Sequence, residues 1–459
     1  MNKQFDAIII GSGQAGPALA ARLTAAKLSV AFIEREHHGG TCVNDGCIPT
    51  KALVASAHAA FVARRHADFG VTIGRPIGVD MKAVKARKDA IVDASVNGVT
   101  NWVTGMPGLT TFWGHARFAG SHQVTVNGET LEAEKIFINV GGRPVIPDWP
   151  ALREIPYLTN TSIMKVDFLP EHLIVIGGSY IGLEFAQMYR RFGSRVTVVE
   201  QGPRLVGRED DDVSEAIQDI LTREGVECRR NAKCIGVAKR DAGVAVTADC
   251  VDGTPEIVGS HVLLAIGRRP NTDDLGLDAA GIATNERGYI VVDEQLRTTV
   301  PGVWAMGDVN GRGAFTHTSW NDYEIVAANL LDNDPRRVSD RIAAYALFID
   351  PPLGRVGLTE REVRASGRKA LIGKMPMTRV GRAKERGETL GFMKVIVEAE
   401  TKRILGASLL GLNGDEVVHS LLDVMYASAP YTVLSRATHI HPTVSELIPT
   451  LLQNLKPLQ

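Results

Sequence analysis

The sequence predicts an α/β protein in which two doubly wound sheets are followed by a C-terminal α+β domain. Two segments share one pattern: a buried strand, a glycine-rich turn, an amphipathic helix and a second buried strand that ends in an acid. The first segment runs from Phe5 to Glu34 and the second from His172 to Glu200. From Arg341 onward the pattern changes to strands mixed with helices. Each of the first two segments is therefore interpreted as a βαβ unit belonging to its own sheet.

The boundaries of these elements follow from periodicity and turn residues. In the first unit we expect a helix over Pro17–Lys27 and in the second a helix over Leu183–Phe192. Between and after the units we expect helices at Thr50–Ala67, Asn321–Leu331, Glu416–Tyr426 and Ser445–Asn454, and strands at Thr110–Phe118, Gln123–Val126, Lys135–Val140, His261–Ile266, Gly391–Glu398 and Ile404–Leu410. The predicted domains are 1–150 with 265–335, then 151–264, then 336–459.

Charge and cysteine content exclude several classes of protein. The 459 residues include 51 Lys and Arg against 52 Asp and Glu, so no net basic charge favours nucleic acid or an anionic membrane. No apolar run reaches about 18 residues, and the N-terminus has no signal-peptide pattern. Five cysteines are too few for a secreted disulfide scaffold. We therefore expect a cytoplasmic protein without a nucleic-acid or membrane partner.

The turn of the first unit is typical of a dinucleotide site. Its glycines are Gly11, Gly13 and Gly16, which allow a tight turn, a close backbone approach to a pyrophosphate, and close helix–strand packing. The N-terminus of the following helix offers unpaired N–H groups to phosphates. Glu34 lies about 20 residues further on, where a carboxylate accepts hydrogen bonds from ribose hydroxyls.

The turn of the second unit predicts a second nucleotide site. Its glycines are Gly177, Gly178 and Gly182, and its acid is Glu200. A carboxylate there suits a free ribose 2′-hydroxyl and repels a 2′-phosphate, which favours NADH over NADPH. Arg204 and Arg208 follow closely and could bind a 2′-phosphate instead, so the choice stays open.

Cys42 and Cys47 form the most specific pattern in the chain. Two cysteines five residues apart on the first turn of a helix can form an exchangeable disulfide. A helix N-terminus and the nearby Lys51 both lower the pKa of a thiol. The alternatives are a structural disulfide, which a reducing compartment disfavours, and a metal site, for which only His37 and His38 are close. We expect no metal site.

These motifs resemble, in order along nearly the whole chain, those of the pyridine nucleotide–disulfide oxidoreductases, a family that includes dihydrolipoamide dehydrogenase, glutathione reductase and mercuric reductase. The resemblance rests on the two glycine loops, GGTCVNDGCIPTK, AIGRRPN, Gly307-Asp308, and the ending His439-Ile-His441-Pro-Thr-Val-Ser-Glu446. It implies FAD, a nicotinamide nucleotide and a homodimer formed by the C-terminal domain.

The resemblance also implies roles for individual residues. Those that would bind FAD are Gly11, Gly13, Gly16, Glu34, Gly40, Thr41, Lys51, Ala116, Gly142 and Asp308, and those that would bind the nicotinamide nucleotide are Gly177, Gly178, Tyr180, Gly182, Glu200 and Gly267. Tyr180 would cover the flavin until the nicotinamide displaces it, and Lys51 would pair with Glu184.

For the redox pair, the resemblance implies that Cys47 is the thiolate next to the flavin and Cys42 the thiol that exchanges with substrate. His441, held by Glu446, would serve the cysteine pair of the other subunit, because disulfide exchange needs a proton donor and a base near neutral pH.

Other histidines and cysteines carry less information. We expect His439 to be structural and Cys228, Cys234 and Cys250 to be unreactive, and His317 to lie near the flavin or the subunit interface.

The substrate is less defined than the chemistry. The chain ends without the cysteine pair typical of mercuric reductases, and Asp45 lies between the two cysteines, where a carboxylate should raise the thiol pKa values and disfavour anionic substrates. We expect a reductase of a small disulfide, a thiol-reactive oxidant or a metal ion. The alternatives are a dihydrolipoamide dehydrogenase that reduces NAD and a non-enzymatic flavin redox sensor.

Overall fold

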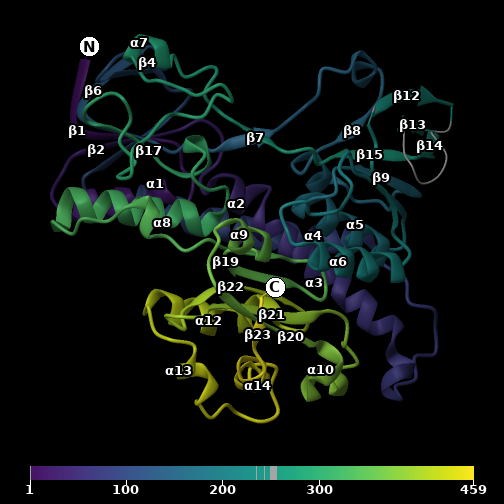
Figure 1. Cartoon of the computed structure of the whole chain (residues 1–459). Coiled ribbons are helices and arrows are strands. Elements are labelled where there is room, and N and C mark those ends of the chain that lie inside the picture. Colours follow the sequence, from purple (N-terminus) through teal and green to yellow (C-terminus); the bar gives the residue numbers. More distant parts are fainter. Residues whose placement is uncertain (1, 234, 242, 249–255, 459) are drawn as a thin grey trace.

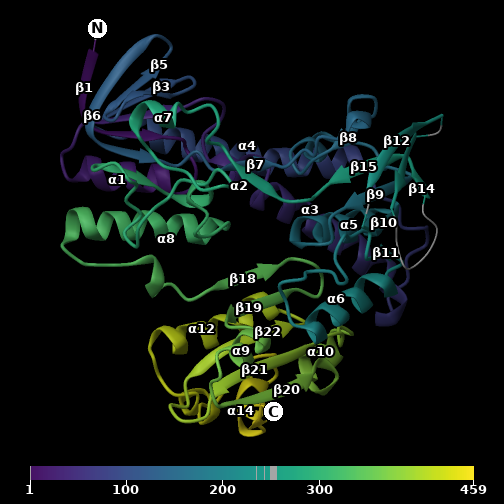
Figure 2. The same ribbon diagram turned by 45° about the horizontal axis from the view of Figure 1, so that its top comes forward.

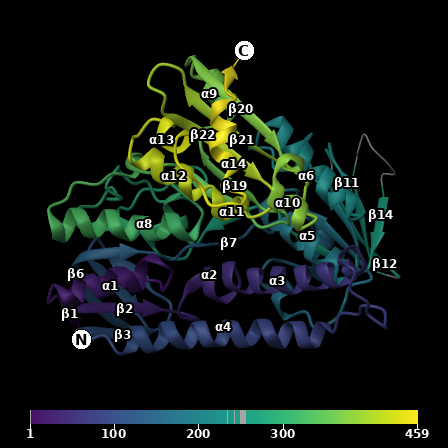
Figure 3. The same cartoon turned by 90° about the horizontal axis from the view of Figure 1, so that it is seen from below.

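The computed structural model describes residues 2–233, 235–241, 243–248 and 256–458, so Cys234 and Cys250 lie outside the described residues. Three regions are visible in Figure 1: a sheet near the N-terminus, a second sheet at the opposite end, and the C-terminal sheet beneath both. Two helices, α3 (Cys47–Arg64) and α4 (Met81–Thr104), run side by side from the first region toward the second (Figure 3).

The first sheet has the strand order β3-β2-β1-β6-β5-β4, and β17 pairs with β6. Its strands are β1 (Asn2–Ile10), β2 (Val30–Glu34), β3 (Leu109–Trp113), β4 (Arg117–Gly120), β5 (Gln123–Val126), β6 (Glu129–Ile138) and β17 (Val303–Ala305). Helices α1 (Ala15–Ala25) and α8 (Thr316–Ala327) pack against each other on one face. Because β17 pairs in parallel with β6, the chain returns to this sheet after leaving it for more than 100 residues.

The second sheet is parallel throughout, in the order β11-β10-β9-β15-β8. Its elements are β8 (Tyr157–Leu158), β9 (His172–Ile176), α5 (Tyr180–Phe192), β10 (Arg195–Val199), α6 (Asp211–Arg223), β11 (Glu227–Arg229) and β15 (His261–Leu264). An antiparallel sheet of β12 (Gly236–Arg240), β13 (Gly243–Thr247) and β14 (Glu256–Gly259) lies beside it. The chain crosses between the two regions through β7 (Gly142–Pro144) and β16 (Arg268–Pro270), which pair with each other.

The C-terminal sheet has the order β18-β19-β22-β21-β20-β23 and is antiparallel. Its strands are β18 (Ala344–Leu347), β19 (Leu353–Gly357), β20 (Ala370–Pro376), β21 (Phe392–Glu398), β22 (Ile404–Leu410) and β23 (Lys456–Pro457). The remaining helices are α2 (Gly40–Asn44), α7 (Leu277–Ala280), α9 (Glu360–Ala365), α10 (Gly381–Glu385), α11 (Gly414–Val417), α12 (His419–Tyr426), α13 (Thr432–Ser435) and α14 (Leu447–Gln453). The predicted fold class is confirmed, and the exact domain boundaries stay a prediction.

Several predicted elements differ from the structure. The helix α4 was not predicted at all, because few of its side chains are buried and its apolar periodicity is weak. The sequence does mark the start of this helix with an N-cap residue, Asp80, whose side chain accepts hydrogen bonds from the N–H groups of Lys82 and Ala83. The predicted strand Thr110–Phe118 is two strands separated at Gly114, and the predicted helix Glu416–Tyr426 is divided into α11 and α12.

One segment of the described chain, Gly40–Arg64, is long and apolar enough by length and composition to cross a membrane, although the sequence predicted none. Helices packed inside soluble proteins meet the same criterion. Here α3 packs along α4 and α5, and the backbone changes direction at Asp45 and Gly46. The segment is therefore weak support for a membrane span.

Candidate active site

The first glycine loop joins β1 to α1 in a conformation that only small residues allow. Gly11 has φ +97°, and a Cβ there would lie 2.4 Å from the carbonyl oxygen of Asn139. Glu34 braces the loop, because its Oε2 accepts a hydrogen bond from the Ser12 N–H at 2.9 Å. The fully described α1 has neither a side-chain cap nor an acid in its first turn, so its N-terminal amides face no competing carboxylate.

The second loop repeats this geometry. Gly177 has φ +112°, and a Cβ there would lie 2.4 Å from the carbonyl oxygen of Ala265. The carboxylate of Glu200 accepts hydrogen bonds from the N–H groups of Gly178 at 2.7 Å and Gly202 at 2.6 Å. Like α1, the fully described α5 begins without a side-chain cap or an acid in its first turn. Both loops thus fit a pyrophosphate at a helix N-terminus.

The two cysteines lie on different helices, which corrects the prediction of one helical turn. Cys42 belongs to the short α2, whereas Cys47 is the first residue of α3. The chain turns between them at Asp45 and Gly46, where a Cβ on Gly46 would lie 2.7 Å from the carbonyl oxygen of Thr41. The helix α3 starts three residues earlier than predicted because Pro49 is accommodated in its first turn.

The two thiols have opposite proton affinities. A hydrogen bond from Cys42, aided by one from Thr316 and by the charge of Lys51, lowers the pKa of Cys47 to about 6. The same interaction with Cys47, together with burial, raises the pKa of Cys42 far above its ordinary value. Cys42 is therefore a protonated donor and Cys47 a thiolate acceptor at neutral pH.

Asp45 does not act as the sequence suggested. Its carboxylate accepts a hydrogen bond from the hydroxyl of Thr161, and its backbone oxygen accepts one from Asn160 at 3.3 Å. The pKa shifts of Cys42 and Cys47 come chiefly from the other thiol, from burial and from Thr316, and Asp45 is not among the main causes for either thiol. The structure therefore gives no support to the expectation that Asp45 raises the pKa values of the thiols.

Lys51 and Glu184 connect the cysteine helix to the second unit. The Nζ of Lys51 on α3 lies 2.8 Å from Oε2 of Glu184 on α5, as the resemblance implied. The other carboxylate oxygen of Glu184 accepts the N–H of Phe348 at 3.0 Å, and the ring of Phe348 lies 4.3 Å from the Lys51 ammonium. This ion pair therefore places a positive charge near Cys47 and links three segments of the chain.

A second group of predicted residues gathers around Arg268 and the first loop. Arg268 donates to the Thr41 hydroxyl at 3.3 Å and to the Gly142 carbonyl, and its Nε lies 3.9 Å from Asp308. Burial raises the pKa of Asp308. Gly40 lies against Gly13, where a Cβ on Gly40 would come within 2.9 Å of the Gly13 Cα.

Of the remaining predicted positions, Ala116 is buried beneath the first sheet and Gly267 has φ +119° beside the crossing strands.

His441 and Glu446 form a pair at the far end of the chain. The Nδ1 of His441 lies 2.8 Å from Oε2 of Glu446, and the histidine side chain is 80% exposed. Among the described residues of this single chain, no hydrogen bond or ion pair joins His441 to either cysteine. Glu446 thus orients the imidazole of His441, and the imidazole itself is exposed to solvent.

Two further histidines, His317 and His38, have local partners, and Cys228 is partly buried and lies away from the redox pair. His317 stacks on Phe315, and its Nε2 lies 2.7 Å from the carbonyl oxygen of Ala344. His38 is buried with Nδ1 3.1 Å from the Ser12 hydroxyl. Burial raises the pKa of Cys228 to about 11, so it is a poor nucleophile at neutral pH. The described residues contain no group of three or more His, Cys, Asp or Glu side chains placed to hold a metal ion.

Sequence reasoning missed three residues that organise the site. Asn139 accepts the Gly16 N–H at 3.1 Å and donates to the Met306 carbonyl at 2.9 Å, so it fixes the first loop. The Thr316 hydroxyl lies 3.1 Å from the Cys47 sulfur. Glu209 accepts the hydroxyl of Tyr180 at 3.1 Å. Only Asn139 had a signal, as a polar residue that ends a buried strand.

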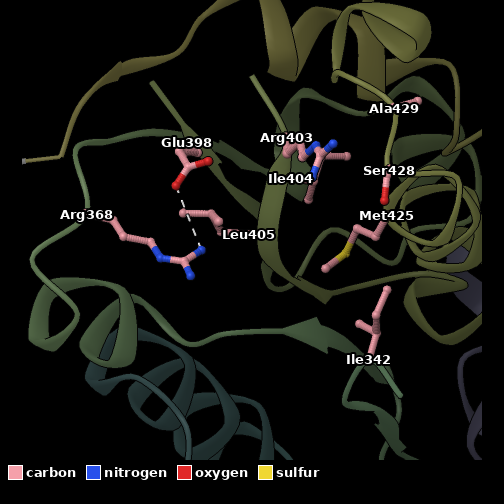
Figure 4. A pocket seen from close by; sticks show the side chains of 9 residues that line it. All are labelled: Ile342, Arg368, Glu398, Arg403, Ile404, Leu405, Met425, Ser428 and Ala429. Atoms are coloured by element: carbon pink, nitrogen blue, oxygen red, sulfur yellow. Dashed lines mark ion pairs between the residues drawn. The ribbon is translucent and has the colours of Figure 1, made fainter. Parts of the chain in front are cut away.

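The hollow in Figure 4 lies elsewhere, in the C-terminal domain. Its volume is about 460 Å³, and its lining includes Arg403 and the pair Arg368–Glu398, whose charged atoms are 3.8 Å apart. None of its lining residues belongs to the glycine loops or the cysteine helices. It is therefore separate from the candidate active site.

The chain combines two βαβ units of the nucleotide-binding type with a pair of cysteines whose pKa values shift in opposite directions. This combination defines a class of protein that exchanges electrons between dinucleotides and a disulfide. The profile of the pyridine nucleotide-disulphide oxidoreductases matches residues 5–322, and that of their dimerisation domain matches residues 343–452. The chain belongs to the pyridine nucleotide-disulphide oxidoreductase family. The family uses FAD and NAD(P)H, which both glycine loops fit.

Individual relatives cover nearly the whole chain. The probable pyridine nucleotide-disulfide oxidoreductase RclA of Escherichia coli is 38% identical over 99% of this chain and 100% of its own length. A mercuric reductase of Streptomyces lividans is 34% identical, covering 97% of this chain and 94% of the relative. A dihydrolipoyl dehydrogenase of Thermus scotoductus is 33% identical, covering 97% and 96%.

Solved structures agree with these matches. The HOCl-induced flavoprotein disulfide reductase RclA from Escherichia coli, alone and as a Cu(II) complex, superposes with a TM-score of 0.90 at 37% identity. The match covers 98% of this chain and 100% of each solved chain.

Proposed function

We propose that this protein moves electrons from NAD(P)H through FAD to the Cys42–Cys47 pair, and on to a small disulfide, a thiol-reactive oxidant or a metal ion. The observation that carries the proposal is the placement of the two cysteines: Cys42 lies on α2, and Cys47 begins α3 one turn before Lys51, which is paired with Glu184. The raised pKa of Cys42 and the lowered pKa of Cys47 agree with an exchanging thiol and a thiolate. We assign Cys42 as the exchanging thiol and Cys47 as the thiolate that faces the flavin.

Bound FAD would supply two-electron transfer from the nicotinamide to the disulfide. With a disulfide substrate, the Cys42 sulfur attacks one substrate sulfur and displaces the other as a thiolate. The Cys47 thiolate then attacks Cys42, which releases the second substrate thiolate and restores the Cys42–Cys47 disulfide. A base must first remove the Cys42 proton, and an acid must protonate each departing thiolate.

We assign the proton transfers to His441 of the second subunit in a homodimer. Its Nδ1 is fixed by Glu446, which leaves Nε2 for proton exchange. The side chain is exposed in one chain, and residues 343–452 match the family's dimerisation domain. Both facts support a site completed across the subunit interface.

Among the acceptors in this proposal, thiol-reactive oxidants and Cu(II) are supported by the descriptions of solved relatives. RclA is described as HOCl-induced and has been solved as a Cu(II) complex. In a reaction with copper, two Cu(II) ions would each take one electron from the pair formed by the Cys42 thiol and the Cys47 thiolate, which gives two Cu(I) ions, one proton and the disulfide.

Steady-state turnover with NADH and NADPH against disulfides, quinones, Cu(II) and Hg(II) tests the proposal. We expect oxidation of a reduced nucleotide by at least one acceptor, and loss of both turnover and the long-wavelength thiolate–flavin absorption in Cys47→Ser. Cys228→Ser is the matched control, because Cys228 lies outside the site. Full activity in Cys47→Ser would sink the assignment. If no acceptor supports turnover, a non-enzymatic redox sensor becomes the better interpretation.

A second candidate is a dihydrolipoamide dehydrogenase that reduces NAD. The His441–Glu446 pair and the Thermus relative favour it. Rapid NAD reduction by dihydrolipoamide, lost in His441→Gln, would establish this direction over the first.

A further inference from the structure

A fully buried carboxylate, Glu209, lies between the second nucleotide unit and the C-terminal domain. Its side chain is 0% exposed, and one oxygen, Oε1, accepts two phenol hydroxyls: that of Tyr180 at 3.1 Å and that of Tyr345 at 2.6 Å. Its other oxygen, Oε2, lies 3.4 Å from Nε of Arg355, which is also buried. A buried charge is retained only where such partners compensate its desolvation.

The partners of Glu209 come from different parts of the fold. Tyr180 is the first residue of α5, directly after the second glycine loop. Tyr345 lies on β18 and Arg355 on β19, both in the C-terminal sheet. The carboxylate therefore ties the nucleotide loop to the C-terminal domain through the hydroxyl of one tyrosine.

The residues after Glu209 make the same connection. Asp210 accepts the N–H groups of Glu360 and Arg361 and, with Asp212, pairs with the buried Lys394 of β21. Figure 2 shows the start of α6 against the C-terminal sheet at this place. The segment that follows Glu209 is thus also bound to the C-terminal domain.

The ring of Tyr180 packs against two aromatic rings, one of which precedes a residue that contacts the redox pair. It meets Tyr345 edge-on at 5.5 Å and Phe315 edge-on at 6.5 Å. The residue after Phe315 is Thr316, whose hydroxyl contacts the Cys47 sulfur at 3.1 Å. Burial, followed by the charge of Glu209, raises the pKa of Tyr180, so its phenol stays protonated and donates.

We propose that Glu209 is a positioning residue that holds Tyr180 in the closed position over the nicotinamide site and thereby sets the affinity for the nucleotide. The inference rests on the proposed function and on the role that the family resemblance implies for Tyr180, whose ring the nicotinamide would displace. The nucleotide must break the Tyr180–Glu209 hydrogen bond before it can bind, so its apparent Kd equals the intrinsic Kd divided by the fraction of molecules that are open. Removing the bond lowers the Kd.

The test is calorimetric titration of the flavin-loaded protein with NAD⁺ and with NADP⁺, which requires no turnover. We expect Tyr180→Phe to lower the Kd of the preferred nucleotide by about tenfold, the value of one such hydrogen bond. Glu209→Gln should lower it less, because the amide oxygen remains an acceptor. The double variant should match Tyr180→Phe alone, since both changes remove the same bond.

Two controls separate this role from a general effect on the domain contact. Asp212→Asn weakens the ion pairs with Lys374 and Lys394 but leaves the Tyr180 hydroxyl bound, so its Kd should equal that of the wild type. Tyr345→Phe removes the other phenol from Glu209 and should not lower the Kd.

An unchanged or raised Kd in Tyr180→Phe, or additive effects in the double variant, would overturn the inference. Tyr180→Phe keeps the Glu209–Arg355 charge pair, so this outcome can be read even if Glu209→Gln fails to fold. Tight nucleotide binding without turnover on any acceptor would leave this inference standing while the proposed function fails. Absence of nucleotide binding in the wild type would overturn both.

Discussion

The two βαβ units have nearly the same backbone but different side-chain surroundings. In both, an acid braces the glycine loop: Glu34 accepts the Ser12 N–H and Glu200 accepts the Gly178 N–H. The first loop is also bound by the side chain of Asn139, whereas Ala265 occupies the matching position beside the second loop. The first loop is therefore fixed by an extra buried amide that the second loop lacks.

The helices that follow the loops differ more. From α1, the loop-proximal turns contribute small apolar side chains to the core. From α5, Tyr180 reaches Glu209, Glu184 reaches Lys51, and Arg191 is paired with Glu224 and Asp350. The loop-proximal part of α1 thus packs into the core, whereas side chains of α5 connect the second unit with the cysteine helix and the C-terminal domain.

Alanine at matched glycines should have the largest effect and tests whether the two units hold different cofactors. Gly11→Ala and Gly177→Ala each place a Cβ 2.4 Å from a carbonyl oxygen at positive φ. We expect Gly11→Ala to be purified without bound FAD. Gly177→Ala should keep FAD but no longer bind the nicotinamide nucleotide. Flavin absorbance and nucleotide titration measure the two losses.

Gly207→Ala is the control for both, because a Cβ there meets nothing within 4 Å. Loss of flavin from Gly177→Ala together with full retention in Gly11→Ala would reverse the assignment of the two units.

Asn139→Ala tests the extra amide of the first unit. The change removes the amide that binds the buried Met306 carbonyl and leaves the Gly16 N–H with only its 3.1 Å contact to the Gly13 carbonyl, which costs about 1–3 kcal/mol of unfolding free energy. Urea denaturation measures the loss. Asn101→Ala, on the exposed side of α4, should change the stability by less than about 0.5 kcal/mol. Equal losses of unfolding free energy in the two variants would show that the Asn139 side chain does not stabilise the first loop.

Glu200→Ala should alter nucleotide choice, whereas Glu34→Ala should not. Removing the Glu200 carboxylate removes its repulsion of a 2′-phosphate, so the ratio of kcat/KM for NADH over NADPH should fall by about tenfold. Glu34→Ala should weaken FAD binding and leave that ratio unchanged. A wild-type preference for NADPH would instead indicate that Arg204 or Arg208 binds the 2′-phosphate.

The parts of the fold that could be predicted depend on local sequence. The glycine loops, β5 and β22 are continuous patterns whose residues carry their own signal, and the predicted limits of these two strands agree with the structure. Helix α4 could not be found by periodicity, because an exposed helix needs no apolar stripe.

The parts of the site that were missed depend on distant contacts. Cys42 and Cys47 are five residues apart, so their pairing is visible in the sequence. Thr316 meets Cys47 across 269 residues, and Tyr345 meets Glu209 across 136 residues. Nothing in the local sequence of either residue encodes such a contact, which arises only when the sheets pack.

The two members of the Lys51–Glu184 ion pair should shift the pKa of Cys47 in opposite directions. The pKa of Cys47 is lowered to about 6, chiefly by the Cys42 hydrogen bond, so the thiolate forms as pH rises through about 6. In the reduced protein, iodoacetamide labelling of Cys47, followed by mass spectrometry, should therefore have its midpoint near pH 6. Cys42 should show no such acidic midpoint, because its pKa is raised.

Lys51 lowers the pKa of Cys47 and Glu184 raises it. Lys51→Met should accordingly move the labelling midpoint to higher pH, and Glu184→Gln should move it to lower pH. Lys82→Met, which removes an exposed lysine at the start of α4, is the control and should leave the midpoint in place. Shifts of the same sign in Lys51→Met and Glu184→Gln would mean that the ion pair acts on Cys47 through the position of α3 rather than through charge.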